Sequence, residues 1–463
     1  MKFLTPQALF HLLSTDKLRS TGNEQKGRVR STSRAIGVGR RRLWQKSTSS
    51  DWIISLKSKI GALDDERSLK MSIFKVPNKL RKVDEEAYSP RLVSIGPFHS
   101  SRTNKHDHLL AMDEQKRWYM LYLLNRTLNP EETLVQFVEA ISELKPKVQR
   151  RYAENIKFKP QVLSEIMLDD GCFILELFLR SKLKDFGEED PIFHNAWMVP
   201  TLRHDLALLE NQIPFFILEK LFNIVVRQFP EHLSCSITDL ALSFFYPDLN
   251  LNQEAIRMKC SQVGICSHLL DLLHSFYIPT FPETDPKAKE TRKFNKCATE
   301  LVAAGIEFVK GKEDHFLDIN FNKATGVITI PSFHIDERTK SLIRNFIALE
   351  QSIGSGTQQH ITSYAILLES LIRSSSDIAL LWKENIITND LSEFEDVLTF
   401  FKSISREVVP MDFNFGALCE DVCSNKCWNN VEKERKKRKA FYLKMKNFIN
   451  LQIQYQSASI YDE

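Results

Sequence analysis

The sequence predicts an α+β fold that is predominantly α-helical, with a helical body and a small element of short strands. Apolar residues recur at helical spacing along most of the chain. One segment instead alternates apolar and polar residues up to 322–326 (Asn-Lys-Ala-Thr-Gly), and an apolar run at 327–330 follows. This pattern predicts a β-hairpin with Gly326 in the turn. At 463 residues, 43% of them hydrophobic, the chain is long enough to bury a large core.

The uneven distribution of charge predicts that the chain is divided into three parts. Residues 1–50 contain 11 Lys and Arg against two acids, and residues 432–446 contain eight against two. The net charge of the whole chain is only +4, so residues 51–431 carry −9 once Asp462 and Glu463 are counted. We expect a basic disordered arm at 1–50, a globular domain at 51–410 with a variable loop region at 247–290, and a basic helical tail at 411–463. An acidic body argues against a specific nucleic-acid surface.

Helices and strand-like runs alternate with prolines and glycines that stop them. Short strand-like runs are predicted at 72–77, where Pro77 ends the run, and at 92–99, where Gly96 and Pro97 interrupt it. Helices are predicted at 52–63, 106–125, 131–144, 160–183, 267–275, 341–353, 360–374, 377–384, 392–404 and within 411–450.

The densest apolar stretch is 205–222, and three polar residues and a proline interrupt it: Glu210, Asn211, Gln212 and Pro214. Since Pro214 suits the first turn of a helix, we expect one helix to end near Asn211 and the next to begin at Pro214. Buried polar side chains need hydrogen-bond partners, so we interpret the trio as caps of these helix ends. A ligand-binding or catalytic site is the alternative.

Acidic residues within or beside apolar helices are the candidates for enzymatic chemistry: Asp169, Asp170, Glu176, Asp205, Glu210, Glu350, Glu369 and Asp377. Several carboxylates meeting inside a helical body can hold a divalent cation, so a metal-dependent hydrolase is one hypothesis. However, no repeated Glu-x-x-His spacing occurs, and the G-x-S-x-G, H-E-x-x-H and phosphate-loop signatures are missing. The sequence therefore predicts no metal, no cofactor and no enzymatic activity.

The chain shows no membrane-spanning or secretory segment. Its best apolar window, 213–229, is broken by Glu219, Lys220 and Arg227. Eight scattered cysteines without a signal peptide favour reduced thiols inside the cell. We expect a cytoplasmic or peripheral location. The nucleus is an alternative, since an import signal, a solvated helix face or a juxtamembrane patch would each fit the basic run Arg435, Lys436, Lys437, Arg438 and Lys439.

A set of motifs in a fixed order resembles a plant protein family. The motifs lie at 73–77 (Ile-Phe-Lys-Val-Pro), 93–99 (Val-Ser-Ile-Gly-Pro-Phe-His), 112–116 (Met-Asp-Glu-Gln-Lys), 167–176, 205–216, 330–331, 344–351 and 377–381. Together they resemble the plant family known as domain of unknown function 247, over about residues 51–408.

The resemblance implies a mostly helical α+β body, usually tethered to the plasma membrane by a C-terminal hydrophobic segment, with no established enzymatic activity. Some members in grasses are linked to self-incompatibility, which suggests recognition. This chain departs from the family at its end, because the basic residues 433–446 stand where the hydrophobic segment is expected. Membrane association is therefore doubtful. Our leading hypothesis is a non-enzymatic recognition or signalling protein whose partner is another protein.

Overall fold

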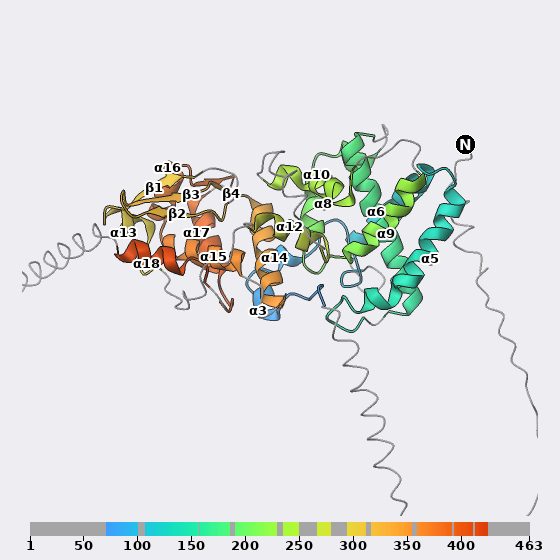
Figure 1. Cartoon of the computed structure of the whole chain (residues 1–463), viewed down its shortest axis with the longest axis horizontal. Helices are drawn as coiled ribbons and strands as arrows, with labels where there is room; N and C mark the ends of the chain where they lie inside the picture. Colours follow the sequence, from blue (N-terminus) through green and yellow to red (C-terminus); the bar gives the residue numbers. More distant parts are fainter. Residues whose placement is uncertain are drawn as a thin grey trace, which may run out of the picture.

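The computed structural model is an elongated, mostly helical body, with the N-terminal helices at one end and the C-terminal helices and strands at the other (Figure 1). It describes residues 71–424 except 101–106, 157, 186–189, 229–234, 250–265, 279–293, 312–315, 354–358, 391–392 and 411–412. The predicted arm at 1–50, the helix at 52–63 and the tail beyond residue 424 lie outside the described residues.

The N-terminal end is built around one long buried helix. Helix α6 (Pro160–Leu183) starts at a proline in its first turn and is buried along most of its length. Around it pack α4 (Asp107–Asn125), α5 (Pro130–Gln149), α9 (Phe215–Gln228) and α10 (Ile237–Leu249). Because α6 is apolar on nearly every side, it can be covered only from several directions at once.

The C-terminal end combines short strands with helices. Strands β2 (Asn320–Asn322) and β3 (Val327–Ile330) form the predicted antiparallel hairpin, and Gly326 has a φ of +74° in its turn. Strand β1 (Glu307–Lys310) pairs in parallel with β3, and β4 (Phe333–Ile335) pairs in parallel with β5 (Ile387–Asn389). The helices of this end are α13 (Ala298–Val302), α15 (His360–Leu371), α16 (Ser375–Lys383), α17 (Phe394–Ile404) and α18 (Gly416–Ser424).

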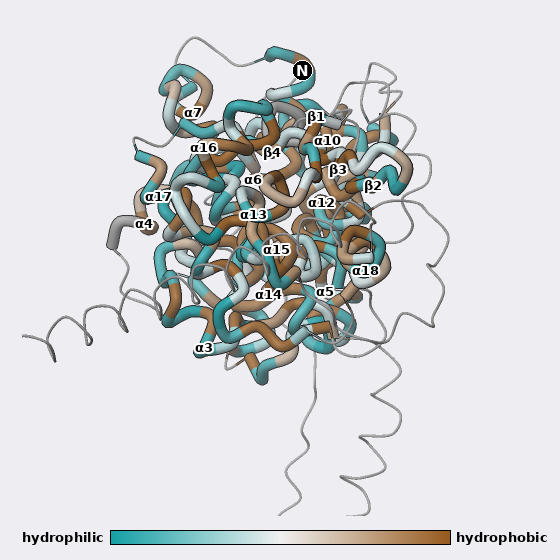
Figure 2. Tube along the Cα trace, turned by 90° about the vertical axis from the view of Figure 1, so that its left-hand side faces the viewer, coloured by the Kyte–Doolittle hydropathy of each residue, from teal (hydrophilic) through white to brown (hydrophobic). Residues whose placement is uncertain are grey.

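Two helices lie between these ends: α12 (Leu269–Tyr277) and α14 (Glu337–Ile353) (Figure 1). Three short elements lie near them: α3 (Asn78–Arg81), η1 (Glu86–Tyr88) and α8 (Met198–Leu206). The short helix α7 (Pro191–His194) packs against α8. One hydrophobic core runs through the whole body, from Ile73 and Phe178 to Phe346 and Phe401. Seen end-on, much of the hydrophobic trace lies in the middle of the molecule (Figure 2).

The predicted fold class is confirmed, and two local predictions are wrong. The runs at 72–77 and 92–99 are not strands, and the bridge between Ile73 and Tyr152 is the only β pairing among their described residues. The helix expected to end near Asn211 ends at Leu206. In the part of the chain that the structure describes, no helix is both long enough and apolar enough to span a membrane.

Candidate functional site

Residues 72–99 form a strap, here called the N-terminal strap, that has little regular structure. Only α3 and η1 interrupt it. Many of its residues are nevertheless buried, and buried main-chain N–H and C=O groups must find hydrogen-bond partners. Side chains from distant parts of the chain supply many of these partners, and four of the predicted site residues are among them: Asp170, Asp205, Glu210 and Asn211.

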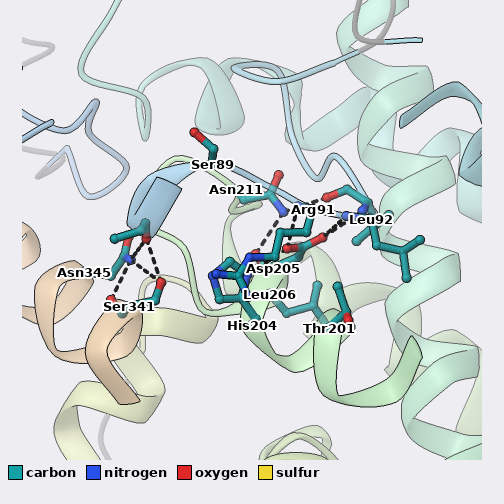
Figure 3. A network of polar contacts seen from close by, with 12 residues as sticks. Ser89, Arg91, Leu92, Thr201, His204, Asp205, Leu206, Asn211, Ser341 and Asn345 are labelled. Atoms are coloured by element: carbon teal, nitrogen blue, oxygen red, sulfur yellow. Dashed lines mark hydrogen bonds and ion pairs between the residues drawn. The ribbon is translucent and has the colours of Figure 1, made fainter. Parts of the chain in front are cut away.

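Asp205 binds three consecutive N–H groups of the strap (Figure 3). Its Oδ1 accepts from Arg91 at 2.9 Å, and its Oδ2 accepts from Leu92 at 2.6 Å and Val93 at 2.8 Å. His204 Nδ1 lies 2.9 Å from Oδ1. The carboxylate is fully buried, so these donors replace the water that would otherwise solvate its charge.

Asn211 and Gln212 bind main-chain groups on both sides of the corner. Asn211 Oδ1 accepts from Ile95 N–H at 2.6 Å, while its Nδ2 donates to Val93 O and Asp205 O. Gln212 Nε2 donates to the carbonyls of Leu206 and Leu208, both at 2.8 Å. These side-chain amides donate hydrogen bonds to the last carbonyls of α8 and of the turn after it. Because those carbonyls are already bound, the helix ends at Leu206 rather than near Asn211.

Glu210 binds the beginning of the strap. Its Oε1 accepts from Val76 N–H at 2.7 Å and lies 2.6 Å from Arg81 Nη2, and its Oε2 lies 3.2 Å from His99 Nε2. Burial alone would raise the pKa of Glu210. The hydrogen bond from His99, the charge of Arg81 and the Val76 N–H outweigh burial, so the pKa lies below its usual value.

Asp170 binds the far end of the strap. Its Oδ2 accepts from Gly96 N–H at 2.7 Å, and its Oδ1 lies 2.6 Å from Lys116 Nζ. Burial raises the pKa of Asp170, although the charge of Lys116 opposes the shift. The half-buried Asp169 lies beside it, and both line a small polar pocket together with Ser94, Gly96, Ser100, Asp113, Lys116, Arg117 and Ile166.

Gly96 packs tightly against the corner. Its φ is +73°, and a Cβ atom on it would lie 2.3 Å from the carbonyl oxygen of Gln212. Any residue with a side chain would therefore be strained in its backbone and would collide with the corner. Pro214 closes the corner, and α9 begins at the next residue, Phe215.

Glu350 lies apart from these residues. Its carboxylate accepts from the N–H groups of Ile361 and Thr362, at 2.9 and 2.8 Å, at the start of α15. His274 Nε2 lies 2.9 Å from Glu350 Oε1. The structure thus brings Asp170, Asp205, Glu210 and Asn211 together on the strap, while Gln212 binds the carbonyls of Leu206 and Leu208 and Glu350 caps a helix.

Other residues bind the strap that sequence reasoning did not single out. Asn345 Oδ1 accepts from Leu209 N–H at 2.9 Å, and its Nδ2 donates to Ala87 O at 2.8 Å. His268 Nε2 lies 2.9 Å from Ser72 O. A polar residue inside an apolar helical run was an available signal for Asn345, whereas no local pattern indicates what His268 binds.

The arrangement is a framework of occupied acceptors. The carboxylates of Asp170, Asp205 and Glu210 all accept hydrogen bonds from strap N–H groups. Asp170 is also paired with Lys116, and Glu210 is also paired with Arg81. Among the described residues, no group of three or more His, Cys, Asp or Glu side chains could hold a metal ion. His204 is held by Asp205 as a catalytic histidine would be, yet no described residue forms a hydrogen bond with its buried Nε2. Among the described residues, none is therefore hydrogen-bonded to this pair as a nucleophile would be.

Comparison with known proteins confirms the family that the motifs resemble. A family model described as "Plant protein of unknown function" (DUF247) matches residues 73–451, so its match begins with the strap. UPF0481 protein At3g47200 of Arabidopsis thaliana is 28% identical over 360 residues, covering 73% of each chain. Putative UPF0481 protein At3g02645 of the same plant is 21% identical over 456 residues, covering 77% of this chain and 83% of its own. No solved structure matches. With most of its length matched by the family model, the chain belongs to the plant protein family of unknown function 247.

Proposed function

We propose that this protein is a non-enzymatic recognition protein that binds another protein through the exposed face of α4. The observation that carries the proposal is an exposed apolar stripe, made of Leu110, Trp118 and Tyr122. These side chains are 47%, 37% and 43% exposed. Their spacing of eight and four residues places them on one face of the helix. Exposed tryptophan and tyrosine on one surface are typical of the residues that dominate binding energy at protein interfaces.

The aromatic pair of this stripe is held in place before any partner arrives. The rings of Trp118 and Tyr122 lie 6.3 Å apart, and the guanidinium of Arg180 lies 4.2 Å from the Tyr122 ring centroid. Arg180 is itself fixed by ion pairs with Glu176 and Asp190. A side chain that is already ordered loses less conformational entropy on binding, so this stripe suits recognition.

The buried carboxylates support the same proposal by a different route. Those of the corner hold the strap, and Glu350 caps α15, so each has a structural use. A metal-dependent hydrolase stays the alternative, but no observation favours it over recognition.

Affinity capture with paired variants tests the proposal. The tagged full chain would be compared with Trp118→Ala/Tyr122→Ala and with the control Trp382→Ala, which removes another exposed tryptophan (52% exposed) at the C-terminal end, on α16. We expect a partner that is recovered by the wild type and the control and is depleted at least about tenfold by the double variant, since two hot-spot residues are lost.

Thermal unfolding of the three proteins would show that the variants are folded. Equal recovery of every co-purifying protein by all three would overturn the α4 surface. Failure to recover any specific partner from the tissue that expresses the protein would overturn the recognition proposal itself.

A further inference from the structure

A cluster of cations lies at the C-terminal end of α5, on a body that is otherwise acidic. Residues 143–159 contain six Lys and Arg against two acids, so this segment carries +4, whereas residues 51–431 together carry −9. The C-terminus of a helix favours cations, but only within its last turn. Because the basic run continues to Lys159, beyond the end of α5 at Gln149, the helix dipole does not account for it.

Three of these cations have no acidic partner among the described residues: Lys145, Lys147 and Arg150. Arg150 is exposed, and the two lysines are half-buried. One of the two acids in the segment, Glu154, is already paired with Lys75 of the strap at 3.0 Å. The positive charge at the end of α5 is therefore not balanced from within this part of the molecule.

An aromatic ring holds two of the cations side by side. The ammonium of Lys147 lies 4.1 Å from the ring centroid of Phe216, and the guanidinium of Arg151 lies 5.9 Å from the same centroid. Lys147 thus faces Phe216 rather than Glu143, the acid one turn earlier on α5. Like charges four residues apart repel each other, so a carboxylate bound between Lys147 and Arg151 would relieve their repulsion.

The main chain beneath these cations is fixed by the strap and by the corner. Arg151 O accepts from the N–H groups of Ser72 and Ile73 at 2.9 and 3.0 Å, and the Tyr152 hydroxyl donates to Gln212 O at 3.0 Å. A surface that is already ordered loses less conformational entropy when it binds. The cluster therefore presents its charges on a rigid support.

We propose that this basic patch, made of Lys145, Lys147, Arg150 and Arg151, binds a carboxylate-rich segment of a partner protein. Asp and Glu side chains supply the charge that the patch lacks, and the planar guanidinium of an arginine suits a carboxylate. No aromatic side chain of residues 143–159 is exposed, and Phe216 is half-buried under the cations, so the patch has no aromatic anchor for a bilayer. The patch lies on α5 rather than on α4, so its test does not depend on the α4 stripe.

Zero-length cross-linking of the full chain tests the patch. A carbodiimide joins carboxylates directly to lysine amines, and mass spectrometry identifies each lysine that has reacted. The probe is a synthetic peptide of alternating Glu and Ser, and its Gln and Ser analogue sets the background. We expect the yield at Lys147 to exceed that at Lys383 and Lys402 by at least about fivefold, because the patch gathers several cations. Lys383 is 82% exposed, so exposure alone would favour the control.

Two charge-reversed variants separate the position of the charge from its total. Lys145→Glu/Arg150→Glu keeps Lys147 as the reporter, and its yield there should fall by at least about fivefold. Lys383→Glu/Lys402→Glu makes the same change of net charge on α16 and α17 and should leave the yield at Lys147 unchanged. Thermal unfolding shows whether both variants fold. If the patch reversal does not, Lys145→Gln/Arg150→Gln takes its place, with an expected fall of at least about twofold.

Salt gives a further check on the wild-type chain. Raising NaCl from about 0.1 M to about 1 M shortens the screening length from about 10 Å to about 3 Å, so the preference for Lys147 should disappear. Equal yields at Lys147, Lys383 and Lys402 in low salt would overturn the patch. So would a yield at Lys147 that the patch variant does not lower.

Two other occupants would also overturn the proposal. Vesicles of phosphatidylserine and phosphatidylcholine test a membrane by sedimentation. Binding that only the patch variant loses, without a preference of the peptide for Lys147, would assign the patch to a lipid surface. Light scattering tests a second copy of the chain, since a dimer that only the patch variant loses would assign the patch to self-association.

Discussion

The corner at Asp205 and the ion cluster at Glu176 both bury a carboxylate completely, but they satisfy it differently. Asp205 binds main-chain N–H groups of the strap. Glu176, on α6, binds two arginine side chains: Arg126 at 2.8 and 3.0 Å and Arg180 at 2.7 Å. The first arrangement joins a carboxylate to the backbone, and the second joins side chains to one another.

This difference decides which of the two can be replaced. Side-chain partners can be removed together with the carboxylate, leaving no buried charge behind. Main-chain N–H groups remain whatever the sequence, so they still need an acceptor after Asp205 is lost. We therefore expect the corner to be essential to the fold and the ion cluster to be exchangeable as a set.

The largest effect is expected from Asp205→Leu. Three N–H groups of the strap, one buried and two part-buried, would lose their acceptor, and each unsatisfied buried group costs about 1–3 kcal/mol, so the loss should be about 3–9 kcal/mol. Soluble yield and urea unfolding followed by circular dichroism would measure it. Asp205→Asn, which keeps one acceptor oxygen, should lose clearly less. Equal stability of Asp205→Leu and the wild type would show that the strap does not depend on this clamp.

Glu176→Leu should cost about 3–5 kcal/mol, because it leaves two arginines buried without their counter-charge. The buried Asp190 also pairs with Arg180, so its charge must be removed with the set. The quadruple variant Glu176→Leu/Arg126→Met/Arg180→Met/Asp190→Asn should return to within about 2 kcal/mol of the wild type in the same urea assay. If the quadruple variant is no more stable than Glu176→Leu, the cluster is not exchangeable and the contrast with the corner fails.

Gly96→Ala should cost about 2–4 kcal/mol, because it combines a left-handed backbone with a collision against Gln212 O. Gly326→Ala is the matched control. Its φ is nearly the same, +74°, but the nearest atom would lie 3.5 Å from the new Cβ, so only about 1 kcal/mol is expected. Thermal unfolding compares the two. Similar losses would mean that close packing of the strap on the corner contributes little.

The smallest effect is a pH dependence that arises at Glu210. Its folded-state pKa is lowered, so its contacts contribute stability above the unfolded value of 4.5 and lose it as pH falls through the folded value. The urea midpoint should therefore fall more steeply below about pH 4.5 in the wild type than in Glu210→Gln. Parallel curves for the two proteins would show that the clamp on Val76 does not depend on charge.

The sequence predicted the elements that depend on neighbouring residues and missed the contacts between residues far apart in the chain. The bounds of α6 and the Gly326 hairpin follow from apolar spacing, a first-turn proline and a turn glycine, all of which lie within the element itself. The runs at 72–77 and 92–99 were taken for strands because they are short, strand-like and stopped by a proline or a Gly-Pro pair, but several of their N–H groups bond to side chains more than 70 positions away. No local pattern carries that information.

The site shows the same division. The sequence placed Glu210, Asn211 and Gln212 at a corner because polar residues interrupted an apolar run, but it could not indicate that Asp170 and Asp205 bind the same strap while Glu350 does not. Convergence of side chains from different helices depends on how the helices pack, and spacing along one helix does not determine it.

The clamps on the strap also impose an order on folding. The side chains that bind the strap are synthesised long after it. Val93 binds Asp205, which lies 112 residues later in the chain. Ser72 binds His268, 196 residues later, and Ala87 binds Asn345, 258 residues later. Contacts of such separation form slowly, and a ribosome releases the strap long before its partners. We expect that the strap, although made first, is among the last parts to be fixed, and that its buried residues are the ones a chaperone meets during synthesis.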